Sequence, residues 1–375
     1  MVQRCEIRFD DNPQGIYQGG QTLSGSVELH LDKPKLVNDF RLVISGCAEV
    51  KWTERKGRNS KVTYSGKEEL LRAETSLIPQ SYGNTEIPAG IHVYNFSSPI
   101  PTEVPTSFEG DYGKIRYTVR AILDRPWKFD QTSTAAFTVL KPLDLNQHIL
   151  TLKECRKEKR TKTFCCWLCL SSPLYVGVEL PVTGYVPGQK IPITVALNNT
   201  SSVEVIGIKS KLERKVSYIS EFPREKTRVV DERLASVWTT VRNDKSAQYT
   251  QELKVPSVAP TGKCSVLVID YVLVVKVHVD GCHSNPEIEI PITIGTIPFT
   301  LPPTTAEPNV DQIGWTLALP LPTAPESPGT DNILPPSYGG TAVNVNDNEP
   351  TAIGFQALFP RNPVLYKFDS CAKWN

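Results

Sequence analysis

A cluster of cysteines near the middle of the chain has residue types and a spacing that could do chemistry. Thiolates bind Zn²⁺, and Cys166-Trp167-Leu168-Cys169 has a separation that zinc ligands often show. Adjacent cysteines in an extended segment point in different directions, however, and the sequence contains no second pair with this separation. We therefore predict no metal site. The cluster comprises Cys155, Cys165, Cys166 and Cys169.

The same cluster lies beside a basic segment, which offers a second kind of chemistry. A lipid chain on a cysteine and a polybasic patch together hold a protein at a membrane. S-acylation at Cys165, Cys166 or Cys169 is therefore an alternative to buried or chemically idle thiols, which we favour. A thiol-based redox sensor is a further alternative, and it requires an exposed cysteine of low pKa.

The sequence shows none of the short motifs that position catalytic or cofactor-binding groups. A GxSxG nucleophile elbow, a GxxxxGK[ST] phosphate loop and an HExxH zinc helix are absent. The five histidines have no motif partner, and each is more simply a surface residue. We expect a protein that is not an enzyme and that uses no cofactor.

A short proline motif near the end of the chain predicts a binding function. In Leu334-Pro335-Pro336-Ser337-Tyr338-Gly339-Gly340 the two prolines favour an extended backbone, so the segment can dock on an aromatic-lined groove with little left to order. Pro335, Pro336 and Tyr338 form a PPxY motif, the kind of ligand that a WW domain binds. The structural alternative is a proline turn before the two glycines. A weak second candidate, with valine in place of the second proline, is Pro363-Val364-Leu365-Tyr366.

The basic segment next to the cysteines has two interpretations. It either lies on an anionic membrane surface, where each basic side chain contributes about 1 kcal/mol, or forms a solvated linker. Nucleic acid is not expected as a partner, because aromatic residues do not alternate with the basic residues of this segment. The whole chain also carries a formal charge of only +1. The basic residues are Lys153, Arg156, Lys157, Lys159, Arg160 and Lys162.

Composition and the first residues favour a cytoplasmic protein. Residues 1–6 already carry charge and lack an apolar run of signal-peptide length. The nine cysteines are an odd number, which favours free thiols in a reducing compartment. The most apolar stretch, residues 264–279, is too short to span a bilayer and contains Asp270 and Lys276, so we interpret it as a buried strand.

Alternation of apolar and polar residues predicts an all-β protein. Leu23 to Leu31 and Ile115 to Leu123 alternate with period two, as half-buried strands do. The polar stretch 51–72 reads as a hairpin with a charged, mobile tip. Arg125-Pro126-Trp127 is either a contact surface or a strand-ending turn that packs on Trp127, and we favour the turn.

The second half of the chain repeats the first. Tyr185 to Leu197 matches Tyr17 to Leu29 without a gap, and Tyr271 falls at the position of Tyr117, so both tyrosines are expected in the core. The repeat therefore predicts two copies of one immunoglobulin-like β-sandwich. We predict sandwiches at 5–145 and 172–297, a basic, cysteine-containing linker at 146–171 and a disordered, proline-rich tail at 298–375.

Several unrelated motifs in a fixed order give the chain a resemblance to the arrestin-domain-containing proteins, the alpha-arrestins. The motifs are Gly15-Ile16-Tyr17 with Gly20-Gln21, the run from Phe108 to Tyr117, Leu123-Asp124-Arg125-Pro126-Trp127, the Cys165 to Cys169 block, and the run from Gly184 to Gln189.

The resemblance implies tandem arrestin-like sandwiches in an adaptor recruited to the plasma membrane and endosomes. The sandwiches would engage a transmembrane receptor or transporter, while Pro335, Pro336 and Tyr338 recruit a WW-domain HECT-type ubiquitin ligase, so that the cargo is ubiquitinated, internalised and sorted. A trafficking-coat subunit similar to retromer's arrestin-like component is the alternative. One branch of the family binds thioredoxin through a cysteine just before Ala-Ser-Trp, and the matching stretch, Arg233 to Trp238, has no cysteine. We do not predict that partner.

Overall fold

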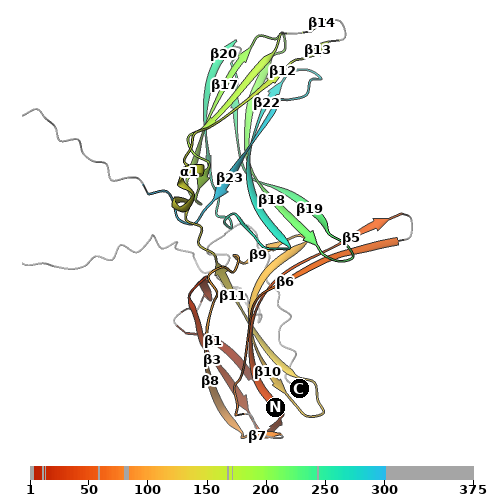
Figure 1. Cartoon of the computed structure of the whole chain (residues 1–375), viewed down its shortest axis with the longest axis vertical. Helices are drawn as coiled ribbons and strands as arrows, with labels where there is room; N and C mark the ends of the chain where they lie inside the picture. The colour runs from red at the N-terminus through yellow and green to blue at the C-terminus, as the bar shows by residue number, and fades with distance from the viewer. Residues whose placement is uncertain are drawn as a thin grey trace, which may run out of the picture.

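The computed structural model shows two β-sandwiches that follow one another along an elongated molecule (Figure 1). It describes residues 4–10, 12, 14–57, 60–79, 84–166, 169–170, 172–242 and 245–300. The prediction of two tandem, all-β sandwiches is confirmed. Within these ranges, no helix has both the length and the apolar character needed to cross a bilayer.

The first sandwich packs a sheet of order β1-β3-β8 against a sheet of order β2-β11-β10-β5-β6, in which β9 also pairs with β10. Strand β3 buries every second residue, as its sequence predicts, and β4 pairs with β7 beside the two sheets. The strands are β1 (Arg4–Phe9), β2 (Ile16–Gln18), β3 (Thr22–Leu31), β4 (Lys35–Val37), β5 (Asp39–Lys56), β6 (Ser60–Ser76), β7 (Thr85–Ile87), β8 (Gly90–Pro99), β9 (Phe108–Gly110), β10 (Gly113–Asp124) and β11 (Gln131–Leu140).

The second sandwich repeats this plan, with an added edge strand, β12, and an added pair of short strands, β13 and β14. Its sheets have the orders β12-β15-β17-β20 and β16-β23-β22-β18-β19, with β21 paired to β22. The apolar stretch interpreted as a buried strand is β22. The strands are β12 (Arg156–Lys162), β13 (Cys165–Cys166), β14 (Cys169–Leu170), β15 (Leu174–Leu180), β16 (Gly184–Tyr185), β17 (Lys190–Asn199), β18 (Val205–Ser220), β19 (Lys226–Thr240), β20 (Ser246–Lys254), β21 (Gly262–Lys263), β22 (Leu267–Val279) and β23 (Glu287–Ile294).

The repeat extends to single hydrogen bonds. Tyr117 donates its hydroxyl proton to the carbonyl of Pro105, and Tyr271 donates to the carbonyl of Ala259, in each case twelve residues earlier. Gly20 and Gly188 hold the same left-handed turn, with φ of 89° and 92°. Both tyrosines are 1 % exposed, so the prediction that they are core residues is confirmed.

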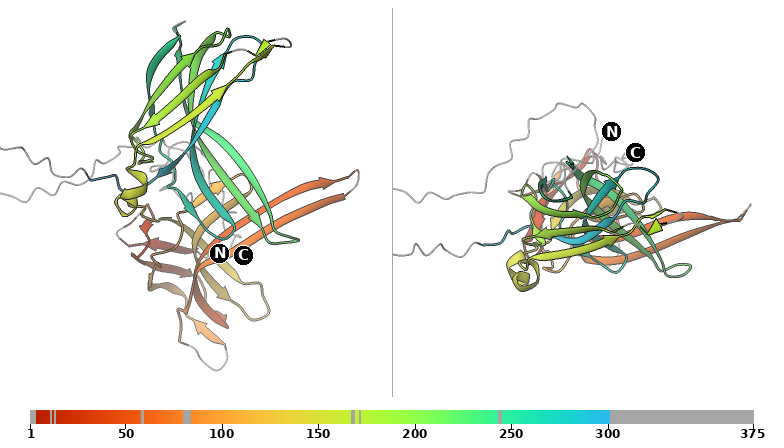
Figure 2. Two further views of the ribbon diagram at one scale, coloured as in Figure 1. Left: turned by 45° about the horizontal axis from the view of Figure 1, so that its top comes forward. Right: turned by 90° about the horizontal axis from the view of Figure 1, so that it is seen from above.

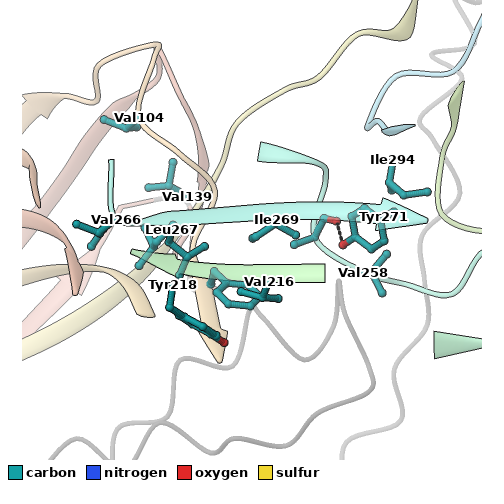
Figure 3. Close-up of a cluster of buried hydrophobic side chains, with 14 of the residues drawn as sticks. Val104, Val139, Val216, Tyr218, Val258, Val266, Leu267, Ile269, Tyr271 and Ile294 are labelled. Atoms are coloured by element: carbon teal, nitrogen blue, oxygen red, sulfur yellow. Dashed lines mark hydrogen bonds between the residues drawn. The ribbon is translucent and has the colours of Figure 1, made fainter. Parts of the chain in front are cut away.

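The buried side chains of the two sandwiches form one continuous cluster. Figure 3 shows Val104 and Val139 of the first sandwich near Val266 and Leu267 of the second, with Tyr271 and its hydrogen bond further along the same cluster. The two sandwiches therefore share apolar packing where they meet, which favours one fixed arrangement over free rotation about a linker.

The structure corrects the prediction of a linker at 146–171. The chain forms a short 3₁₀ turn η1 (Leu145–His148) and helix α1 (Ile149–Leu152), and then enters the second sandwich as β12, which pairs antiparallel with β15 from Arg156↔Leu180 to Lys162↔Leu174. The error has a physical cause. An edge strand with two solvated faces needs no apolar alternation, so its sequence cannot be told from a polar linker.

The predicted hairpin at 51–72 is confirmed, and it projects from the body farther than any other described segment (Figures 1 and 2). Strands β5 and β6 remain paired out to Lys56↔Ser60. Trp52 and Tyr64 stack at 5.4 Å between ring centroids and are the last buried pair before the tip. Beyond them the exposed side chains are polar or charged, and the charged ones include Arg55, Lys56 and Lys61.

Candidate functional site: the seam between the sandwiches and the surfaces beside it

Backbone hydrogen bonds join the two sandwiches directly. Ser65 on β6 and Phe222, just after β18, form an antiparallel bridge: the amide of Ser65 donates to the carbonyl of Phe222 at 2.8 Å, and the amide of Phe222 donates back at 2.9 Å. The amide of Lys67 donates to the Glu221 carboxylate at 3.3 Å. Residues about 155 apart in the chain therefore extend the β-pairing of one sandwich onto the other.

Carboxylates of the first sandwich accept hydrogen bonds from the second. Glu68 accepts from the amide of Ser265 at 2.7 Å and from its hydroxyl at 2.6 Å. Glu54 accepts from the indole of Trp52 at 3.1 Å and pairs with Lys226, and this ammonium group holds the pKa of the Glu54 carboxyl below its usual value. The charge on each carboxylate is thus used to fix the position of the neighbouring sandwich.

Aromatic and guanidinium groups fill the centre of this seam. The guanidinium of Arg228 lies 3.9 Å from the centroid of the Tyr112 ring and donates to the Tyr112 hydroxyl at 2.8 Å. Tyr112 in turn meets Tyr218 edge to face at 5.7 Å. Tyr218 is buried, and burial, reinforced by Asp111, raises its pKa to about 12, so its hydroxyl stays protonated at neutral pH.

The seam contains a small hollow in which the duplicated halves face each other. Pro105 and Thr106 line it from the first sandwich, and Pro260 and Thr261, their counterparts, line it from the second. Its volume of about 190 Å³ is below the roughly 300 Å³ at which pockets for small molecules begin. Structurally, the seam is an interface that holds the two sandwiches in one arrangement.

The predicted basic segment lies on an exposed edge strand rather than in a linker. Arg156 and Lys157 are paired with Glu158 and Glu179, at 2.6 Å and 3.1 Å. Arg160 donates to the carbonyl of Glu287 at 2.7 Å, and Lys162 donates to the Ser284 hydroxyl. Carboxylates thus offset part of the basic charge. Lysine-rich edges also discourage edge-to-edge pairing with another sheet, which gives these residues a structural role that does not require lipid. Lys153 is exposed at the end of α1, and Lys159 is exposed on β12.

The cysteine block forms a hairpin at the end of the second sandwich. Cys165 pairs with Leu170 and Cys166 with Cys169 through the backbone of β13 and β14. Among the described side chains, no group of three or more His, Cys, Asp and Glu residues is placed to hold a metal ion. The side chains of Cys165, Cys166 and Cys169 lie outside that description, so idle thiols and S-acylation stay as the two alternatives at these positions.

Three other thiols are in environments opposite to those of reactive cysteines. Burial raises the pKa of Cys47 to about 11, with Glu49 adding to the effect, and burial raises that of Cys264 to about 11. Desolvation and the neighbouring Glu179 carboxylate raise the pKa of Cys155 as well. A raised pKa lowers the thiolate fraction, so these sites do not support the redox-sensor alternative.

Alkylation rates check this conclusion. At pH 8 a thiol of pKa near 11 has about 100-fold less thiolate than an unperturbed cysteine, so Cys47 and Cys264 are expected to react with iodoacetamide about 100-fold more slowly than free glutathione. Mass spectrometry of the native protein over a time course measures each site, and the urea-unfolded chain provides the control. A rate at either site equal to that of glutathione would revive the redox-sensor alternative.

Comparison with known proteins places this architecture in a family. The arrestin (or S-antigen) N-terminal domain matches residues 5–146, and the arrestin C-terminal domain matches residues 170–299. The chain is 31 % identical over 342 residues to mouse arrestin domain-containing protein 4, which covers 87 % of this chain and 80 % of the relative. It is also 31 % identical over 321 residues to arrestin domain-containing protein 17 of Caenorhabditis elegans, covering 80 % and 72 %. The chain belongs to the alpha-arrestin family.

The ligand motif predicted for this alpha-arrestin lies outside the described residues. Pro335, Pro336 and Tyr338 fall in 301–375, as do Pro363 and Tyr366 of the second candidate. The described body ends at Thr300, whose amide donates to the Asn146 side chain at 2.9 Å. The described residues therefore end beside η1 and α1, and the motif itself stays a prediction.

Sequence reasoning missed the residues that join the two sandwiches of this alpha-arrestin and misjudged the exposure of Trp127. The seam residues, such as Glu68 and Arg228, carry no local signal, because each is an ordinary charged residue on an alternating strand. The turn favoured at Arg125-Pro126-Trp127 is present, but the expectation that it packs on Trp127 is wrong: this side chain is 103 % exposed, which agrees with the alternative of a contact surface. The signal that could have revealed it is Pro126 followed by a large residue where a turn usually takes glycine.

Proposed function

We propose that this alpha-arrestin is a non-enzymatic adaptor that links transmembrane receptors or transporters to a WW-domain HECT-type ubiquitin ligase. The observation that carries the proposal is the combination of a duplicated arrestin body with the PPxY motif Pro335-Pro336-Ser337-Tyr338 beyond its last strand. The body engages cargo, the tail recruits the ligase, and the cargo is ubiquitinated, internalised and sorted. The protein acts from the cytoplasm at the plasma membrane and endosomes.

The body places the end of the described chain and the projecting β5–β6 hairpin on opposite sides, so ligase and cargo can bind at different places. The chain leaves the body beside α1, whereas the β5–β6 hairpin projects from the opposite side, in every view of Figures 1 and 2. About 35 residues separate Thr300 from Pro335, and a flexible chain of that length has a root-mean-square reach of roughly 30 Å. A ligase bound to the motif therefore reaches the surroundings of a cargo without competing for the hairpin.

The projecting hairpin is the part of the body best placed to contact cargo. Its tip carries Arg55, Lys56 and Lys61, all exposed, and its base is fixed to the second sandwich through Glu54 and Lys226. A basic tip on a rigid base is complementary to acidic segments on the cytoplasmic side of membrane proteins. The bridge between Ser65 on β6 and Phe222, just after β18, also ties the hairpin to the second sandwich.

Proximity labelling in cells tests the proposal as a whole. Wild type is expected to label HECT-type ligases and transmembrane proteins, and Tyr338→Ala is expected to lose the ligases while keeping the transmembrane proteins. This outcome would show that ligase binding depends on the motif and that cargo binding does not. Unchanged ligase labelling by Tyr338→Ala would contradict the role of the motif. A stable, stoichiometric complex that is insensitive to Tyr338→Ala would favour the coat-subunit alternative instead.

A further inference from the structure

The connection between β10 and β11 displays two aromatic side chains in full contact with solvent. Trp127 is 103 % exposed and Phe129 is 95 % exposed, the highest values among the large apolar side chains of the described residues. Single exposed apolar side chains are ordinary on protein surfaces, whereas two large rings two residues apart place a larger apolar area in water at one point of the surface. Neither ring contributes burial to the core.

The backbone of this connection holds the rings outward at a cost. Lys128 donates its amide to the carbonyl of Arg125, with Pro126 and Trp127 between them, which is the arrangement of a type II turn. Trp127 has φ of 60°, the left-handed conformation that this turn position normally reserves for glycine. The guanidinium of Arg125 closes the loop by donating to the carbonyl of Phe129 at 3.2 Å and 2.7 Å. Strained residues that a local network keeps in place are typical of functional sites.

Basic residues lie in the same loop as the two rings and at its base. Burial lowers the pKa of Lys35 to about 8, and the nearby positive charges of Arg125 and Lys128 add to this effect. Its ammonium group donates to Gln131 at 3.0 Å, which fixes it at the base of the loop. Two acidic residues, Asp124 and Asp130, flank the loop, and Asp124 accepts a hydrogen bond from Asn38 at 2.8 Å.

We infer that the β10–β11 loop is a membrane-interface anchor, in which Trp127 and Phe129 enter the headgroup region of an anionic bilayer and Arg125 and Lys128 face lipid phosphates. Trp and Phe favour the boundary between headgroups and acyl chains, and basic residues beside them add attraction to anionic lipid. The loop lies at the end of the first sandwich remote from the second sandwich (Figure 1), so nothing in the described body obstructs its approach to a flat surface.

The convex shape of the site favours lipid over a protein partner. Aromatic anchors at protein interfaces work when they fill a pocket or sit within a flat patch ringed by other contacts. Here both rings are almost fully exposed on a short connection between two strands, and a fluid bilayer accommodates exposed rings without a complementary pocket. The inference does not rest on the tail motif, since membrane contact through this loop requires neither Tyr338 nor a ligase.

Vesicle flotation with the full chain tests the anchor. Wild type is expected to float with vesicles of phosphatidylcholine and phosphatidylserine and to float less with phosphatidylcholine alone. The double variant Trp127→Ala/Phe129→Ala is expected to lose about 10- to 100-fold in partitioning to the anionic vesicles, because two large apolar side chains are removed. Trp238→Ala removes a tryptophan that is 45 % exposed on the other sandwich, and it should partition as wild type. Tyr338→Ala should also float as wild type does, so a failure of the membrane anchor can be distinguished from a failure of the ligase motif.

A glycine variant distinguishes loss of the anchor from loss of the fold. Trp127→Gly supplies the residue that the turn prefers, so its urea midpoint is expected to equal or exceed that of wild type while its vesicle partitioning falls. Equal flotation of wild type and the double variant would overturn the inference. Failure of the wild-type chain to float with anionic vesicles would also overturn it, and would leave the rings as a contact for another protein.

Discussion

Tyr338→Ala is expected to weaken binding of the full chain to a WW domain by about 10- to 100-fold. The ring of a tyrosine in a PPxY ligand is its largest apolar group, and burying a side chain of that size contributes roughly 1.5–3 kcal/mol. A single short proline motif starts from a Kd on the order of 10 to 100 μM, because few groups contact the domain. The loss should therefore bring binding close to the limit of detection. Isothermal titration calorimetry with an isolated WW domain measures it.

The second candidate motif provides the matched control for this experiment. Pro363-Val364-Leu365-Tyr366 keeps the first proline and the tyrosine but has valine in place of the second proline, so it lacks the paired, preorganised prolines. Tyr366→Ala is expected to leave the affinity within about 2-fold of wild type, and Pro336→Ala should reproduce the loss seen with Tyr338→Ala. Equal effects of Tyr338→Ala and Tyr366→Ala would mean that two linked sites share the binding.

The sequence predicted those features whose signal repeats along the chain. Tyr117 and Tyr271 were placed in the core because each lies in a long alternating strand and because the two strands match, and the structure confirms both. Register within a strand is strongly specified when one face is buried, so a period of two suffices. The projecting hairpin was predictable for the same reason, since Trp52 and Tyr64 lie in two polar strands that face each other across a short turn.

What the sequence did not reveal depends on pairing between distant or polar segments. The strand from Arg156 to Lys162 has no buried face, and only its partner β15 makes it a strand. The contact between Glu68 and Ser265 joins residues 197 positions apart, and no local pattern encodes it. Exposure of single aromatics is equally hidden: Trp52 is 3 % exposed and Trp127 is 103 % exposed, although both sit among charged residues in the sequence. The first faces a partner strand, while the second occupies a left-handed turn position.

Replacement of either matched core tyrosine by alanine is the change with the largest expected effect on stability. Tyr117→Ala and Tyr271→Ala should each lower the free energy of unfolding by about 3–5 kcal/mol. Removal of a fully buried ring loses the free energy gained by taking that ring out of water, and it leaves a cavity. The ring of Tyr117 fills its site so closely that a Cβ at Gly46 would lie only 2.4 Å from it, and its hydroxyl satisfies the carbonyl of Pro105 at 2.7 Å. Urea denaturation followed by circular dichroism measures the loss.

Phenylalanine at the same positions measures the contribution of the hydroxyl group to stability. Tyr117→Phe and Tyr271→Phe keep the ring but leave a buried carbonyl without its donor, so each should cost about 1–3 kcal/mol. Tyr175, which is 46 % exposed on β15, is the control: Tyr175→Phe should change the free energy of unfolding by less than about 0.5 kcal/mol. Because the two tyrosines occupy equivalent positions in a duplicated fold, their costs should agree within about 1 kcal/mol. A large cost at one site and none at the other would show that the hydrogen bonds, although repeated, do not have equal roles in the two sandwiches.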